Sequence, residues 1–292
     1  MMSITISPEV TVFFESTSNT VTSVVCDPTT SKVAIIDSVL NFEYASGRTS
    51  TTAADEIIEF IRANNYEVEW VLETHAHADH LSAAPYLKRE LGGKIAIGEH
   101  IKDVQNVFGE VFKEGELFLR DGSQFDHLFR DGETFKLGEI TVEVFYTPGH
   151  TPACVSYLAG DALFVGDTLF MPDFGTARCD FPGGSAETLY RSVQRLLTLP
   201  DETRMFVGHD YKAEGRDLYA WETTVGEQRT RNVHVGIGQD IETFIKMRIK
   251  RDATLNMPRL IVPAIQVNIR AGNMPEPDPE GRIFLKVPVN VL

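Results

Sequence analysis

The chain has 292 residues, of which 42% are hydrophobic and 24% charged, a composition typical of a globular protein with a sizeable core. No apolar run reaches the length of a membrane span, and a formal net charge of −15 argues against a nucleic-acid partner. The N-terminal residues lack a leader pattern and the three cysteines form no C-x-x-C pair, so we expect a cytoplasmic protein with free thiols.

β-Rich runs and helical patterns alternate along the chain. Runs of β-branched and aromatic residues between turn residues predict strands, and apolar residues three and four positions apart predict amphipathic helices. In chain order, the predicted elements are strands over 10–14, 21–25 and 33–36, a helix over 52–64, a strand over 68–72, a helix over 81–91, strands over 94–98, 140–146, 155–158 and 162–165, a helix over 185–197, a strand over 205–207 and a helix over 241–251. This order indicates an α/β (α+β) fold.

The last part of the chain differs from the rest. After about residue 213 we expect a single helix followed by segments interrupted by proline, as in Met-Pro-Glu-Pro-Asp-Pro over 274–279. We therefore interpret residues 1–220 as a core and residues 221–292 as an extension packed on it within one domain. Scattered phenylalanines in 105–135 favour core packing, with a lid or an interface as the alternative.

The densest chemical signal is the stretch His-Ala-His-Ala-Asp-His over residues 75–80, directly after the strand predicted over 68–72. Imidazole and carboxylate groups suit first-row divalent ions. Three later strands also end at a candidate ligand, and strand ends in such a fold can share one edge of the sheets. The sequence therefore predicts a metal site made from His75, His77, Asp79, His80, His150, Asp167 and His209.

These motifs resemble the metallo-β-lactamase superfamily. Its signature is matched by H-x-H-x-D-H after a strand, Thr-Pro-Gly-His over 147–150, Gly-Asp-Thr-Leu-Phe over 166–170 and Gly-His-Asp-Tyr over 208–211. The resemblance covers residues 10 to about 212. It implies an αβ/βα sandwich, in which helices flank two mixed sheets and the metal site lies at the sheet edge.

Two subfamilies with different chemistry retain these ligands. A chain similar to glyoxalase II would hold two zinc ions and hydrolyse glutathione thioesters, with a water between the metals as nucleophile. In that case the resemblance implies His75, His77 and His150 on one metal, Asp79, His80 and His209 on the other, and Asp167 as the bridge.

A chain similar to the persulfide (sulfur) dioxygenases would hold one Fe(II) through His75, His150 and Asp167, a 2-His-1-carboxylate triad with open positions for O2 and a sulfur substrate. The remaining four motif residues would then orient ligands and waters. Residues 177–181 favour this second reading, because Ala-Arg-Cys-Asp-Phe resembles the Gly-Arg-Thr-Asp-Phe segment of that family, from which Ala177 and Cys179 depart. Similarities over 227–232 and 268–272 extend the likeness to nearly the whole chain.

The resemblance also implies a substrate, glutathione persulfide, which the enzyme would oxidise to sulfite and glutathione. Glutathione carries two carboxylates and one ammonium group, and an arginine fork pairs well with a carboxylate. We assign its binding to Arg178, Asp180, Tyr211 and Arg270, with Asp180 pairing either the ammonium group or a neighbouring arginine. We further expect a homo-oligomer, a dimer or tetramer. A non-catalytic metal-binding or redox-sensing module is the third alternative.

Overall fold

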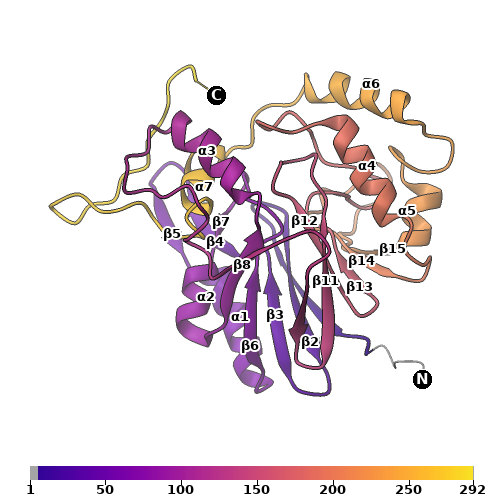
Figure 1. Cartoon of the computed structure of the whole chain (residues 1–292), viewed down its shortest axis with the longest axis horizontal. Coiled ribbons are helices and arrows are strands. Elements are labelled where there is room, and N and C mark those ends of the chain that lie inside the picture. Colours follow the sequence, from indigo (N-terminus) through magenta and orange to yellow (C-terminus); the bar gives the residue numbers. More distant parts are fainter. Residues whose placement is uncertain (1–5, 292) are drawn as a thin grey trace.

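Two six-stranded sheets pack face to face in the computed structural model, which describes residues 6–291 (Figure 1). The first sheet has the order β1 (Glu9–Glu15), β2 (Thr20–Asp27), β3 (Lys32–Ile36), β6 (Glu67–Leu72), β8 (Lys94–Gly98) and β9 (His127–Phe129). The second has the order β10 (Thr134–Leu137), β11 (Ile140–Tyr146), β12 (Val155–Ala159), β13 (Ala162–Phe164), β14 (Arg204–Phe206) and β15 (Glu222–Thr224). A small third sheet has the order β5 (Arg48–Ser50), β4 (Val39–Glu43) and β7 (Leu81–Ser82).

Helices cover the outer face of each large sheet. The first sheet packs through a buried apolar cluster against α1 (Thr52–Ala63), α2 (Ala84–Leu91), α3 (Ile101–Val111) and α7 (Ile261–Asn268). The second packs against α4 (Ala186–Leu196), α5 (Val225–Arg231) and α6 (Ile241–Asp252). Between the sheets, residues such as Leu72, Val144 and Tyr157 form a separate apolar layer. The predicted αβ/βα sandwich is therefore confirmed.

Both large sheets are mixed, and this determines where their strands end. β6 lies parallel to both β3 and β8, and β13 lies parallel to β14, whereas β11 and β12 are antiparallel. The carboxyl ends of parallel neighbours meet at one edge, so loops that leave these strands come together there. Among the described residues, no helix combines the length and apolar character that a bilayer span requires.

Most predicted elements are present, but two predictions were wrong. Residues 81 and 82 pair with β4 as strand β7, and helix α2 begins only at Ala84, whose N–H is bonded to the Ser82 hydroxyl. The tail holds α5 and α7 in addition to the expected α6. α7 was missed because Pro263 interrupts its pattern, although a proline in the first turn of a helix removes no intrahelical hydrogen bond.

The scattered phenylalanines of residues 105–135 are largely core residues. Phe108, Phe112, Phe125 and Phe129 are buried, which agrees with the core interpretation. The cysteines are free and buried, as expected for thiols in a reduced protein. Burial raises the pKa of Cys154 to about 12, so this thiol stays protonated at neutral pH.

Helix α6 is held to the core by a buried ion pair. Arg248, 1% exposed, donates from Nε to Asp252 Oδ1 at 2.8 Å and from a terminal nitrogen to the Thr176 carbonyl at 3.0 Å. The other oxygen of Asp252 accepts from the Cys179 N–H at 2.8 Å. The pair therefore fixes the loop that contains residues 176–179.

We expect Arg248→Met to lower the free energy of unfolding by about 3–5 kcal/mol, because it leaves the Asp252 carboxylate buried without its partner. Urea denaturation followed by circular dichroism measures this change. Arg251→Met is the matched control, since Arg251 is exposed on the same helix, and its effect should stay within about 0.5 kcal/mol. Equal stability of the two variants would contradict the assigned role of the pair.

Candidate metal centre

The structure brings together all seven residues predicted to bind metal. The turn with His75, His77, Asp79 and His80 follows β6, and the loops after β11, β13 and β14 carry His150, Asp167 and His209. Their side chains form two adjacent groups at one edge of the sandwich: His75, His150 and Asp167 in the first, and His77, Asp79, His80 and His209 in the second. The strand-end argument from the sequence is thus confirmed in space.

The first group has the spacing of a single-ion site. The ligand atoms of His75, His150 and Asp167 lie within 4.8 Å of one another. Asp167 Oδ2 is 4.0 Å from His75 Nε2 and 3.7 Å from His150 Nε2, too far for a hydrogen bond. Both distances to Asp167 Oδ2 are shorter than two metal–ligand bonds of about 2.1 Å, so an ion placed between these groups can contact the carboxylate and both imidazoles.

Hydrogen bonds select the nitrogen that each imidazole of this group offers. His75 Nδ1 lies 3.0 Å from the Thr74 hydroxyl oxygen, and that hydroxyl donates its own hydrogen to Asp37. His150 Nδ1 donates to the Arg178 carbonyl at 2.8 Å. Both rings therefore carry their hydrogen on Nδ1 and turn the Nε2 lone pair towards Asp167.

His75 is prepared for metal binding in a second way. Its Nε2 is buried and has no hydrogen-bond partner, an arrangement that is costly unless a ligand occupies the position. Burial, together with repulsion from His77 and His150, holds the pKa of His75 well below its ordinary value. The imidazole is therefore neutral at pH 7, and the neutral form is the one that coordinates metals.

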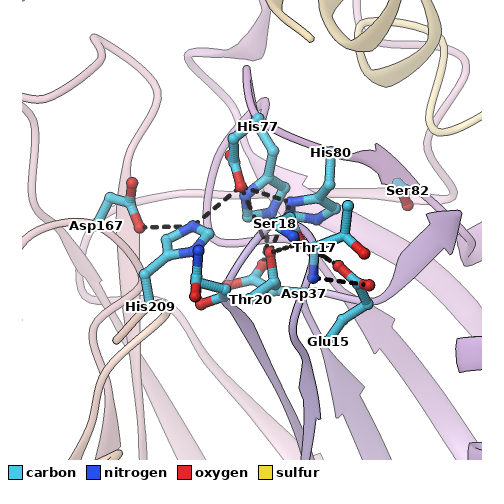
Figure 2. A network of polar contacts seen from close by, with 12 residues as sticks. Glu15, Thr17, Ser18, Thr20, Asp37, His77, His80, Ser82, Asp167 and His209 are labelled. Atoms are coloured by element: carbon cyan, nitrogen blue, oxygen red, sulfur yellow. Dashed lines mark hydrogen bonds and ion pairs between the residues drawn. The ribbon is translucent and has the colours of Figure 1, made fainter. Parts of the chain in front are cut away.

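The second group lies beside Asp167 of the first, and Figure 2 shows the Asp167 carboxylate facing the His209 ring. His80 Nε2 and His77 Nδ1 are buried without partners. Asp167 Oδ1 and Asp79 Oδ2 each lie 3.4 Å from His209 Nε2, while Asp167 Oδ2 faces the first group. One carboxylate thus presents a different oxygen to each group, which is the position of a bridge between two sites.

Charge is balanced locally in the second group. Burial alone would raise the pKa of Asp79, but His209 and His80 hold it well below its ordinary value. Burial alone would lower the pKa of His209, and Asp167 and Asp79 raise it instead. The two carboxylates on either side of His209 Nε2 therefore favour a cation at this point, either a proton or a metal ion.

Two buried carboxylates that the sequence prediction omitted orient His77. Its Nε2 lies 3.0 Å from Asp37 Oδ1 and 3.1 Å from Glu73 Oε2. Asp37 also accepts from the Thr74 N–H and hydroxyl, and Glu73 accepts from the Ser82 hydroxyl, so hydrogen bonds account for this cluster without a third ion. Asp37 and Glu73 directly follow β3 and β6, so the strand-end rule could have found them.

A cavity of about 390 Å³ opens over the first group, within the size range of small-molecule sites. Of the residues assigned to glutathione, Arg178 and Tyr211 line this cavity, whereas Asp180 is not among its lining residues. The Arg178 guanidinium pairs with both oxygens of Asp180 and donates to the Asn256 carbonyl at 2.6 Å. The alternative in which Asp180 pairs a neighbouring arginine therefore describes the observed contact.

The structure does not bring Arg270 to this cavity. Its guanidinium lies 2.7 Å from Glu114 Oε2, stacks over the Phe118 ring at 4.3 Å and donates to the Gln266 carbonyl. Arg270 is only 9% exposed, and it ties the end of α7 to the segment after α3. This correction follows from the docking of α7, which the sequence did not predict.

Two other arginines line the cavity and were missed. Arg251, at the end of α6, stacks over the Phe174 ring, and Arg259 follows in the next loop. Within residues 6–291 neither guanidinium has an ion-pair partner, so both are available to an anion. Arg259 also borders a second cavity of about 480 Å³, which is lined by Asp79 and His80 as well. In the sequence, the only signal for Arg251 and Arg259 is their positive charge in an acidic chain.

An αβ/βα sandwich with a histidine and aspartate centre at its open edge defines a metal-dependent enzyme. The model of the metallo-beta-lactamase superfamily matches residues 18–209, and the chain belongs to this superfamily. Glyoxylase B2 of Dictyostelium discoideum is 50% identical over 286 residues, covering 97% of this chain and 98% of that protein. A protein of Burkholderia pseudomallei described as a probable metallo-hydrolase is 48% identical over 290 residues, covering 96% and 98%.

More distant similarity connects the chain to persulfide dioxygenases. The human mitochondrial persulfide dioxygenase ETHE1 is 29% identical over 262 residues, covering 89% of this chain and 87% of that protein. The crystal structure of ETHE1 from Myxococcus xanthus is 30% identical with a TM-score of 0.72, covering 91% of this chain and 100% of that one. At about nine-tenths of the chain, this similarity extends beyond residue 209, where the region matched by the family model ends.

We expect Gly149→Ala to reduce metal binding, because Gly149 has a φ of 139° and an added Cβ would lie 2.3 Å from the Leu189 Cα. The loop must shift, and His150 moves with it. Gly132→Ala is the control, since Gly132 also has a positive φ, 72°, but no atom within 4 Å of the added carbon. Metal content by mass spectrometry measures the effect, and wild-type content in Gly149→Ala would contradict it.

Proposed function

We propose that the protein is a mononuclear Fe(II) persulfide dioxygenase that converts glutathione persulfide, O2 and water to glutathione, sulfite and two protons. The observation that carries the proposal is the first group, in which two histidines and one aspartate turn free ligand atoms towards one point. This is the donor set of the 2-His-1-carboxylate triad. The similarity to persulfide dioxygenases over most of the chain supports the same assignment.

In this proposal His75, His150 and Asp167 hold the iron. Fe(II) bound there would supply redox chemistry and open coordination positions for dioxygen and a sulfur ligand. Asp37 and Glu73 keep His77 in place, and His77, Asp79, His80 and His209 shape the polar surroundings of the ion. The buried carboxylates of Asp37 and Glu73 counter the positive charge of the centre.

The cavity over this centre suits a substrate with one reactive sulfur and distant carboxylates. Arg178 is neutralised by Asp180, and its carbonyl fixes His150, so we assign it to shaping the pocket beside the metal. Arg251 and Arg259 are available to pair with the carboxylates of glutathione. Tyr211 stacks against His209 with ring centroids 5.6 Å apart and borders the path of the sulfur end of the substrate.

We also propose that the protein is a cytoplasmic homo-oligomer in which residues 221–292 complete the catalytic unit.

A dinuclear zinc hydrolase of glutathione thioesters is the second candidate. The specific observation in its favour is Asp167, whose two oxygens face two different groups of ligands. The names of the two relatives near 50% identity, a glyoxylase and a metallo-hydrolase, agree with hydrolysis. Both candidates use the same edge of the fold and the same tripeptide, so metal count and reaction must separate them.

We expect protein loaded anaerobically with Fe(II) to hold one iron per chain and to consume one O2 for each glutathione persulfide, with sulfite as product. His150→Ala should lose both iron and oxygen uptake. His100→Ala is the control, because the His100 side chain is 41% exposed and pairs with Asp103 instead of the metal centre. Two tightly bound zinc ions, turnover of S-lactoylglutathione and no oxygen uptake would contradict the dioxygenase assignment.

We expect Arg259→Ala to raise the KM for glutathione persulfide about 10-fold with little change in kcat, since a hydrogen bond to a charged group contributes about 1.5–3 kcal/mol. Steady-state oxygen uptake gives both constants. Arg191→Ala serves as control, because Arg191 is exposed on α4 and pairs with Glu187. An unchanged KM in Arg259→Ala would remove this residue from the substrate site.

A further inference from the structure

We propose that Asn268, the last residue of α7, is a positioning residue that fixes the metal-binding turn of residues 75–80. Its Nδ2 donates to the His77 carbonyl at 2.9 Å and to the His80 carbonyl at 2.8 Å. Its Oδ1 accepts from the Ser82 N–H at 2.8 Å. One side chain therefore contacts the turn at three places, from a position 186 to 191 residues away in the sequence.

The contacts at position 268 make specific use of the amide group of asparagine. Both hydrogens of the amide nitrogen are used, and its oxygen accepts the third bond, so a single planar group sets the separation of two backbone carbonyls. Asn268 is 4% exposed, so water does not readily replace these bonds. Aspartate has nearly the same shape but offers no donor, and its charge would face the two carbonyl oxygens.

The end of α7 is itself held firmly against the turn. Gly272 has a φ of 82°, and a Cβ there would lie 2.9 Å from the Ser82 carbonyl oxygen and 2.5 Å from Pro85 Cδ. Gln105 of α3 donates to the Ile269 carbonyl at 2.9 Å. The close approach at Gly272 leaves Asn268 little freedom to move away from residues 77–82.

These contacts complete the restraint on two imidazoles. Asp37 and Glu73 hold the ring of His77 through Nε2, and Asp79 lies 3.2 Å from His80 Nδ1. Asn268 holds the backbone of the same two residues, so each histidine is fixed at both ends. The partner-free nitrogens, His77 Nδ1 and His80 Nε2, are thereby aimed into the metal centre.

Asn268 lies outside the region matched by the family model, which ends at residue 209. The proposed role therefore assigns a function to the C-terminal extension. The inference rests on the metal centre and not on the reaction proposed for it. Metal affinity can therefore test it whether the enzyme is a dioxygenase or a hydrolase.

The test compares Asn268→Asp with Gln266→Ala in the full chain. Gln266 lies on the same helix and is also buried, and its side chain makes three hydrogen bonds, to Val262 and Lys286, none of which reaches the metal centre. Co(II) titration followed by visible absorption gives the dissociation constant and the ligand-field spectrum, and metal content after purification gives a second readout. Circular dichroism and urea denaturation establish that each variant is folded.

We expect Asn268→Asp to raise the metal dissociation constant about 10- to 100-fold and to alter the Co(II) spectrum, because it loosens the turn of residues 75–80, which carries the ligand His75 as well as His77 and His80. Gln266→Ala should bind metal like the wild type even where its urea midpoint falls. If Asn268→Asp does not fold, Asn268→Ser, which keeps one donor, is measured with the same expectation. Wild-type affinity and spectrum in the Asn268 variant, or an equal loss in Gln266→Ala, would overturn the proposal, and a wild-type chain without metal affinity would overturn the metal centre as well.

Discussion

Each imidazole of the centre is held through the ring nitrogen that a metal ion does not need. His75 and His150 are bonded through Nδ1, which exposes Nε2, whereas His77 is bonded through Nε2, which exposes Nδ1. The partners are a hydroxyl, a backbone carbonyl and two carboxylates, which come from the loops after β3, β6 and β13. Because the fold fixes every tautomer in advance, the site depends on correct packing of both sheets.

The loops that supply these partners also shape the substrate side of the site. The Arg178 carbonyl orients His150, and its guanidinium is held by Asp180 beside the cavity. Two residues earlier, the Thr176 carbonyl accepts a hydrogen bond from Arg248 of α6. The C-terminal helices therefore influence the metal centre from two directions, through α6 on the cavity side and through α7 below the turn of residues 75–80. This arrangement explains why the similarity to ETHE1 extends beyond residue 209.

The sequence predicted the features that depend on local patterns. Strands followed directly by His75, His150, Asp167 and His209 were recognisable because period-two apolar runs ended at metal-binding residue types. Asp37 and Glu73 obey the same rule and were omitted because single carboxylates at strand ends are common. Features that depend on tertiary docking were not predictable in this way. Arg270 was assigned to the substrate, yet the placement of α7 directs it to Glu114, while Arg251 and Arg259 reach the cavity without any local motif.

The choice between one ion and two depends on whether the second group binds a metal or a proton. An X-ray absorption and crystallographic study of the anaerobic Fe(II)-loaded protein tests this most directly. We predict a single iron coordinated by His75 Nε2, His150 Nε2 and Asp167, with His209 hydrogen-bonded to Asp79. Two ions bridged by Asp167, with His80 and His209 as ligands of the second, would contradict the account.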